Sequence, residues 1–217
     1  MTKENILSQV ASMGIVPVIA IEKVEHALPL ADALIAGGLP VIEVTFRTAA
    51  AAEVIRLLAE ERPQLIVGAG TVLTGENLKT AKMCGAKFAV SPGLNPNIVR
   101  QAREIGMPFA PGIATPSDIE LALAEGCTFL KFFPAEALGG VPMIEALSAP
   151  YQHTGVKFMP TGGVSMANLE SYLRVKTVAT VGGTWVAKKE DFAAGQWSAI
   201  TERCRSGREV VKKVRGT

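Results

Sequence analysis

The chain has 217 residues, of which 48% are hydrophobic and 19% are charged, and its formal net charge is +2. This length and apolar content are sufficient for one large hydrophobic core. Basic residues gather only in the short stretch 212–215, which gives no indication of a nucleic-acid partner or of an anionic membrane. No apolar run approaches the ~20 residues that a membrane-spanning helix needs.

The cysteines and histidines give no indication of a metal or cofactor. Cys84, Cys127 and Cys204 are odd in number, far apart and outside any CxxC pattern, so neither a disulfide framework nor a zinc site is expected. His26 and His153 have no ligand-like spacing. We expect buried inert thiols, no metal, no signal peptide and a reducing, cytoplasmic location.

Eight apolar, strand-like runs alternate with amphipathic helical stretches, and successive runs begin about 20–28 residues apart, the length of one βα unit. We predict strands at residues 15–21, 41–46, 65–69, 88–91, 108–112, 129–133, 157–160 and 177–181. Helices are predicted at residues 24–36, 49–61, 76–84, 96–105, 117–125, 143–149 and 166–173. One further helix, 3–13, precedes the first strand, and another, 197–214, closes the chain.

This order predicts an α/β protein in which residues 1–217 form a single (β/α)8 TIM barrel domain with an extra N-terminal helix. An open doubly wound sheet is the main alternative. Its usual GxGxxG fingerprint is missing after the first predicted strand, which lowers that alternative.

Glycine, proline and hydroxyl residues follow several of the predicted strands. They occur in Gly68-Ala69-Gly70-Thr71, Ser91-Pro92-Gly93, Pro160-Thr161-Gly162-Gly163 and Gly182-Gly183-Thr184. In a barrel these segments lie at the C-terminal face, where active sites are built, and the last two occupy the usual position of a phosphate site. Glycine there would let the backbone approach a ligand, although tight βα turns alone can also explain it.

Polar residues alternate with apolar ones along the second predicted strand. Glu43, Thr45 and Arg47 share one face, and the residues between them are apolar. The apolar face would pack on helices, so the polar face is expected to point into the barrel. A structural Glu–Arg pair is the alternative to a functional site.

A single lysine lies within the apolar sixth predicted strand. By the same alternation, Phe129, Lys131 and Phe133 point inward, and Leu130 and Phe132 point outward. Lys131 could form a Schiff base, beside a carboxylate that moves protons and a guanidinium that binds an anion. Snorkelling to solvent is the alternative. The phenylalanines and Arg47 favour the neutral amine and an ionised Glu43 favours the ammonium form, so the charge state stays open.

The chain resembles bacterial 2-keto-3-deoxy-6-phosphogluconate (KDPG) and 4-hydroxy-2-oxoglutarate (KHG) aldolases along nearly its whole length. Together the motifs that carry the resemblance are highly specific. They are Glu43-Val44-Thr45-Phe46-Arg47-Thr48, Gly68-Ala69-Gly70-Thr71-Val72-Leu73, Ser91-Pro92-Gly93, Lys131-Phe132-Phe133-Pro134-Ala135-Glu136, Pro160-Thr161-Gly162-Gly163 and Gly182-Gly183-Thr184-Trp185.

The resemblance implies a homotrimeric, metal-independent class I aldolase that cleaves keto acids to pyruvate and an aldehyde. It implies that Lys131 is the Schiff-base residue and Glu43 the acid/base group, acting through water. The other implied roles are binding of the pyruvyl end by Arg47, Thr71 and Thr161, pocket lining by Pro92 and Phe133, and phosphate binding by Gly162, Gly163, Gly183 and Thr184. Some relatives have serine at the Thr184 position, which keeps the hydroxyl.

Three other functions remain open from the sequence. An aldolase for the galactonate epimer would use the same chemistry, but it is less similar around Glu43 and Lys131. A phosphosugar isomerase, epimerase or decarboxylase could share the barrel and its phosphate site. The third is a non-catalytic binding barrel, which would have no need for Glu43, Arg47 and Lys131 together.

Overall fold

The computed structural model describes residues 6–216, in which parallel strands form two curled sheets. One sheet has six strands in the order β5-β4-β3-β2-β1-β9, and the other has three in the order β6-β7-β8. The strands are β1 (Ile15–Ile19), β2 (Val41–Thr45), β3 (Ile66–Gly70), β4 (Phe88–Val90), β5 (Phe109–Ala110), β6 (Gly112–Ile113), β7 (Phe129–Phe132), β8 (Lys157–Pro160) and β9 (Val181–Gly183). Within each sheet the strands from β1 to β5 and from β6 to β8 lie beside their sequence neighbours, and the last strand pairs with the first, unlike the reversed order of a doubly wound sheet.

The two sheets meet at two places. Pro111 separates β5 from β6, because proline has no N–H to donate, and so the single strand predicted at 108–112 is divided. On the other side, isolated parallel bridges join Phe158 to Val178 and Thr161 to Gly182.

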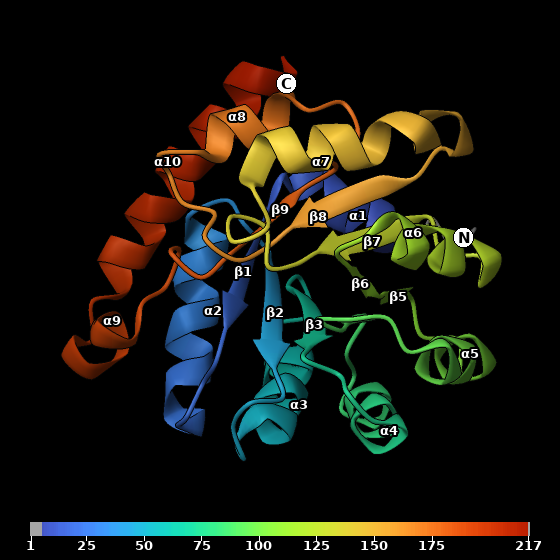
Figure 1. The fold of residues 1–217 in the computed structure, drawn as a ribbon. Helices are drawn as coiled ribbons and strands as arrows, with labels where there is room; N and C mark the ends of the chain where they lie inside the picture. Colours follow the sequence, from blue (N-terminus) through green and yellow to red (C-terminus); the bar gives the residue numbers. More distant parts are fainter. Residues whose placement is uncertain (1–5, 217) are drawn as a thin grey trace.

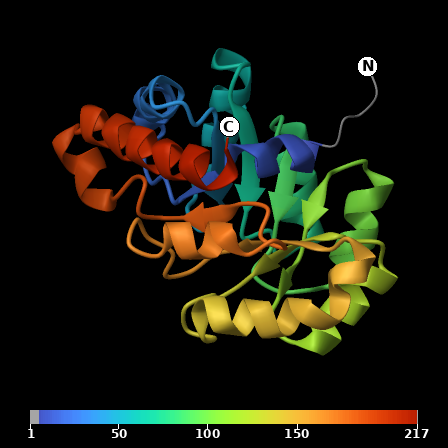
Figure 2. The same cartoon turned by 90° about the horizontal axis from the view of Figure 1, so that it is seen from above.

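Helices lie outside the strands, with α7 and α8 on one side and α3 and α4 on the opposite side (Figure 1). The described helices include α1 (Ile6–Met13), α2 (Ala27–Ala36), α3 (Ala51–Glu61), α4 (Gly75–Met83), α5 (Pro96–Glu104), α6 (Pro116–Ala124), α7 (Gly140–Ser148), α8 (Leu169–Arg174), α9 (Lys189–Ala194) and α10 (Trp197–Arg215). Two 3-10 helices, η1 (Val24–His26) and η2 (Ala149–Thr154), contain the two histidines. From above, α10 lies along one flank of the strands, near α2 (Figure 2).

The strands bury both of their faces. Residues such as Ile42, Val44, Leu130 and Phe132 pack in an outer cluster with the helices. A smaller inner cluster contains Leu7 and Val10 of α1. Val41 and Phe88, the first residues of β2 and β4, belong to it, and the first residues of β3 and β7, Ile66 and Phe129, pack against it. Helix α1 therefore covers the end where the strands begin, and the opposite end is left for a site.

Most predicted elements are confirmed to within a few residues, with the largest differences near the C-terminus. The last strand was predicted at 177–181 but is β9 (Val181–Gly183), because Gly182 and Gly183 pair with Val16 and Pro17 instead of forming the turn. The prediction missed α9, whose six residues are too few to show helical periodicity. Residues 3–5 of the predicted first helix lie outside the described residues.

The start of α6 allows a direct test of local stability. The Thr115 side chain accepts from Asp118 N–H, and Asp118 Oδ2 accepts from Thr115 N–H, which forms a capping box. We expect Thr115→Ala to lower the free energy of unfolding by about 1 kcal/mol, the typical value of an N-cap. Urea unfolding measures this change. Ser117→Ala is the matched control, because the exposed Ser117 side chain makes no hydrogen bond to any described residue; an equal loss there would contradict the assignment.

Candidate active site

The end opposite α1 contains a buried ion pair that crosses the interior between the two sheets. Lys131 is the third residue of β7, and Glu43 is the third residue of β2. Lys131 Nζ lies 3.0 Å from Glu43 Oε1 and 3.4 Å from Oε2. The lysine is 5% exposed and the glutamate 0%. Removing either partner would leave the other buried without its counter-charge, which is costly.

The alternation predicted for these two strands is confirmed. Glu43 and Thr45 are buried on the inner face of β2, and the Thr45 hydroxyl donates to Ile19 O at 3.3 Å. Arg47 Nε donates to Thr45 Oγ1 at 3.2 Å, which holds the guanidinium on the same side. On β7, Lys131 Nζ lies 5.9 Å from the centre of the Phe133 ring, within cation–π range.

The loops after β3 and β4 contain Thr71 and Pro92. Thr71 has φ +57°, and it is the one non-glycine residue with positive φ among residues 6–216. A β-branched residue in this conformation is strained, and such strain is concentrated at functional sites. Pro92 packs tightly against β6: a Cβ atom on Gly112 would lie 2.1 Å from Pro92 O.

The turn after β8 presents backbone N–H groups. Gly162 and Gly163 have φ of +97° and +84°, a region that glycine adopts without strain. The N–H groups of Gly163 and Thr184 have no acceptor among the hydrogen bonds of the described residues. Asn168 Nδ2 donates to Gly163 O at 3.2 Å, and this hydrogen bond helps to hold the turn in place. Thr161, which precedes the turn, is buried and donates to Met159 O at 3.4 Å.

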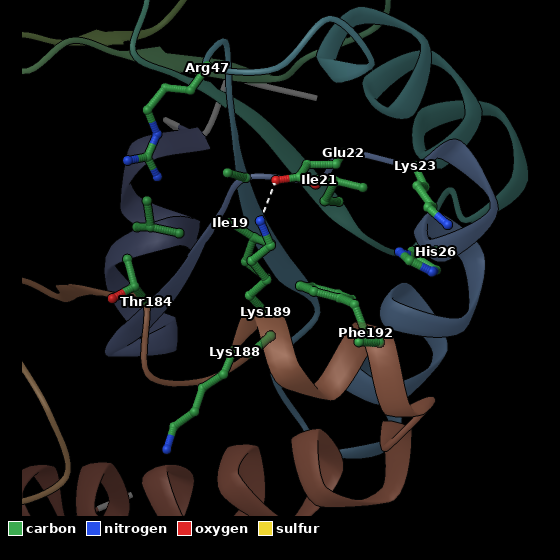
Figure 3. Close-up of a pocket in the computed structure, with 14 residues that line it drawn as sticks. Ile19, Ile21, Glu22, Lys23, His26, Arg47, Thr184, Lys188, Lys189 and Phe192 are labelled. Carbon is green, nitrogen blue, oxygen red and sulfur yellow. Dashed lines mark hydrogen bonds and ion pairs between the residues drawn. The ribbon is translucent and has the colours of Figure 1, made fainter.

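A cavity of about 430 Å³ lies between β1, the segment after β9 and α9. Arg47 and Thr184 line one side of it, and His26 and Phe192 line the other (Figure 3). Lys131 and Glu43 are not among its lining residues. Arg47 lines the cavity and also contacts Thr45, which lies on the same strand as Glu43. A second cavity, of about 720 Å³, lies next to Leu7 of α1 and is lined by none of the predicted site residues.

The three cysteines and His26 have identifiable packing environments. Burial raises the pKa of the Cys204 thiol to about 12 and also raises those of Cys84 and Cys127, so all three favour the unreactive protonated form. The His26 ring stacks on Phe192, with ring centres 5.6 Å apart. Within residues 6–216, no three His, Cys, Asp or Glu side chains are grouped as metal ligands. None of the helices in this part of the chain has the length and apolar character to cross a bilayer.

Known proteins share this fold and sequence. A family profile described as KDPG and KHG aldolase matches residues 6–203. The 2-dehydro-3-deoxy-phosphogluconate aldolase of Haemophilus influenzae is 43% identical over 97% of this chain and 99% of its own length. The KHG/KDPG aldolase of Escherichia coli K12 is 45% identical over 91% of this chain and 92% of its own.

A solved structure agrees with these sequence comparisons. It is the KDPG aldolase from Legionella pneumophila, with pyruvate captured as a covalent carbinolamine intermediate. It superimposes with a TM-score of 0.88 at 41% identity and covers 92% of this chain and 96% of that one. The chain therefore belongs to the KDPG and KHG aldolase family.

Proposed function

We propose that this protein is a class I aldolase that reversibly cleaves KDPG to pyruvate and glyceraldehyde 3-phosphate, and also cleaves KHG to pyruvate and glyoxylate. The observation that carries the proposal is the buried pair of Lys131 Nζ and Glu43 Oε1 at 3.0 Å. An amine and a carboxylate in direct contact can exchange the proton that Schiff-base chemistry requires. The names of the relatives support the substrate.

The reaction begins at Lys131. Its neutral amine attacks C2 of the keto acid, after Glu43 has taken the ammonium proton, and the C2 oxygen is protonated. The C2 oxygen receives its proton from the attacking nitrogen. Glu43 then returns its own proton to the C2 hydroxyl, and the carbinolamine loses water and becomes an iminium, with Glu43 again a carboxylate. The low exposure of the pair limits competition from bulk water during these steps.

Glu43 then acts as general base. It takes the proton of the C4 hydroxyl and the C3–C4 bond breaks. The electron pair of that bond forms the C2=C3 double bond, the C2=N pair moves to the nitrogen to give an enamine, and the aldehyde leaves. Protonation of C3 by Glu43 regenerates the iminium, and hydrolysis releases pyruvate and free Lys131. The carboxylate ends each cycle in its starting state.

The remaining site residues hold the two ends of the substrate. We assign the pyruvyl carboxylate to Arg47, Thr71 and Thr161, with Pro92 and Phe133 as walls of the pocket. A guanidinium can form two parallel hydrogen bonds to a carboxylate and so fix its orientation. The Arg47 contact to Thr45 supports this assignment, because it limits where the guanidinium can lie.

The phosphate end is assigned to the backbone of Gly162, Gly163, Gly183 and Thr184. The unpaired N–H groups of Gly163 and Thr184 support the assignment. Consecutive backbone N–H groups that point into one concavity bind anions. Such a site needs no cationic side chain, so we expect no single Lys→Ala substitution to remove a preference for the phosphorylated substrate.

Gly163→Ala tests the phosphate assignment. Its Cβ would lie 2.5 Å from Glu136 Cβ and would disfavour φ +84°, so the turn must shift. We expect a larger loss of kcat/KM for KDPG than for KHG, because only KDPG reaches this end of the site. Each 1.4 kcal/mol of binding energy lost for KDPG but not for KHG changes the ratio of their kcat/KM values by about tenfold. Equal losses on both substrates, in protein whose circular dichroism spectrum is unchanged, would contradict the assignment.

A coupled assay of pyruvate release tests the function as a whole. KDPG, KHG and the galactonate epimer are compared by kcat/KM, and we expect KDPG to be cleaved faster than its C4 epimer. Activity restricted to the epimer would favour the epimer-specific alternative. An isomerase, epimerase or decarboxylase would release no pyruvate and would need no amine at position 131.

We also infer that the two sheets form one closed (β/α)8 barrel in a single domain, with α1 as an additional N-terminal helix. The short break at Pro111 and the two bridges between the β8 and β9 segments support closure. A homotrimer and a cytoplasmic location are proposed from the family resemblance, and the free cysteines are consistent with a reducing compartment. Analytical ultracentrifugation would test the trimer.

A further inference from the structure

We propose that Gly70 is a positioning residue, whose missing side chain provides the space in which the Glu43 carboxylate meets Lys131. The inference rests on the proposed function only where it concerns turnover. The structural part of the proposal concerns how β2 packs against β3, and it can be tested without any substrate.

Gly70 is the last residue of β3 and lies beside the Glu43 carboxylate of the ion pair. It is the register partner of Thr45, and its carbonyl accepts from Phe46 N–H at 2.8 Å. Because Thr45 faces the interior, its partner faces the interior as well. A Cβ atom on Gly70 would lie 2.1 Å from Glu43 Oε1 and 2.7 Å from both Glu43 Cγ and Cδ.

Position 70 requires glycine because a side chain would not fit there, and not because the backbone needs a conformation that only glycine adopts. Gly70 is not among the glycines with positive φ, and it keeps regular strand pairing, so alanine could adopt its conformation. Gly68, the preceding residue of β3 that faces the interior, also leaves room for a neighbouring side chain. A Cβ atom on Gly68 would lie 2.2 Å from the Phe88 ring. Strand β3 thus lacks inward side chains at two levels, and side chains of the neighbouring strands fill the space.

The consequence concerns the direction in which Glu43 extends. Its carboxylate lies over Gly70 on β3 and reaches Lys131 on β7 from there. A methyl group at position 70 must displace the carboxylate by more than an ångström to restore ordinary contact distances. A misplacement of ~1 Å in a catalytic constellation can cost about 10²-fold in rate.

Kinetics of Gly70→Ala give the first test. We expect kcat for KDPG cleavage and the rate of pyruvate C3 proton exchange to fall by about 10²-fold. Borohydride trapping of pyruvate on Lys131 should still reach completion, because the amine remains in place. The pH profile of kcat should also change, since the displaced carboxylate no longer contacts the amine. Wild-type exchange and kcat in Gly70→Ala would overturn the proposal.

A double-mutant cycle gives the second test and requires no activity. Glu43→Ala removes the atoms that a Cβ at position 70 would meet. We therefore expect Gly70→Ala to lower the unfolding midpoint in urea in the wild-type background and to have little further effect in the Glu43→Ala background. Equal losses in both backgrounds would show that Gly70 is needed for another reason, and would overturn the proposal.

Gly182→Ala is the matched control for this cycle. It adds the same methyl group on β9, where the Cβ would lie 2.2 Å from Thr161 Oγ1 instead of Glu43. Gly182→Ala should lower the unfolding midpoint in urea by the same amount in the wild-type and Glu43→Ala backgrounds. The stability cycle also separates the two proposals: a protein that fails to cleave KDPG but shows the coupling would contradict the proposed function and retain the role of Gly70.

Discussion

Lys131→Ala should abolish aldol cleavage and covalent trapping of pyruvate. Treatment of the wild-type protein with pyruvate and sodium borohydride should reduce the imine to a stable adduct on Lys131, which peptide mass spectrometry can locate. Only an amine can form the iminium that accepts electrons from the breaking C3–C4 bond, and no backbone or hydroxyl group at this site can do so. We therefore expect turnover to fall to the limit of detection. An adduct on another lysine, with Lys131 unmodified, would contradict the assignment.

Two controls would show that the loss of activity in Lys131→Ala comes from the missing amine. Lys131→Arg keeps a cation beside Glu43 but supplies no nucleophilic amine, so it should be inactive while losing less stability than Lys131→Ala, which leaves Glu43 buried without a partner. Lys188, which lines the neighbouring cavity, should remain unmodified by pyruvate and borohydride in the wild-type protein.

The parts of the site that follow from strand alternation could be predicted from the sequence. A period of two places Glu43 and Thr45 on one face of β2 and Lys131 on one face of β7, and the structure has both faces inward. The direct contact between Lys131 and Glu43 needed more than periodicity, because it depends on how the strands curl around one interior.

The role of Gly70 could not be predicted in the same way. Glycines near strand ends were interpreted as turns or as points where the backbone approaches a ligand. The structure shows another use, in which a glycine makes room for a side chain of an adjacent strand. The sequence carries no signal for this, because the clash depends on the register of Gly70 with Thr45. The positive φ of Thr71 was unforeseen for a related reason, since threonine gives no local preference for it.

The C-terminal elements differ most because their local signals are weak. The strand predicted at 177–181 contains β-branched residues, whereas β9 includes two glycines, which have low strand propensity and are held by pairing with β1. The position of β9 affects the proposed phosphate site. It places Gly183 inside the strand and leaves the Thr184 N–H at its end, beside the cavity that Arg47 also lines.

Glu43→Gln should lower kcat for KDPG cleavage by about 10²–10⁴-fold, the usual contribution of general acid–base catalysis. Glutamine has nearly the same shape, so it fits the space over Gly70 and can accept a hydrogen bond from Lys131, but it cannot take a proton. Pyruvate C3 proton exchange, followed by NMR in D₂O, should fall in parallel, whereas borohydride trapping should survive at least in part.

The control for Glu43→Gln is a second buried carboxylate in an ion pair. Asp191 is 4% exposed and pairs with Arg203, away from Lys131. Asp191→Asn should reduce stability without reducing pyruvate C3 exchange in the folded protein. If only buried charge mattered, the two substitutions would have similar kinetic effects. Wild-type cleavage and exchange rates in Glu43→Gln would instead mean that another group moves the proton and that Glu43 serves only to hold Lys131 in place.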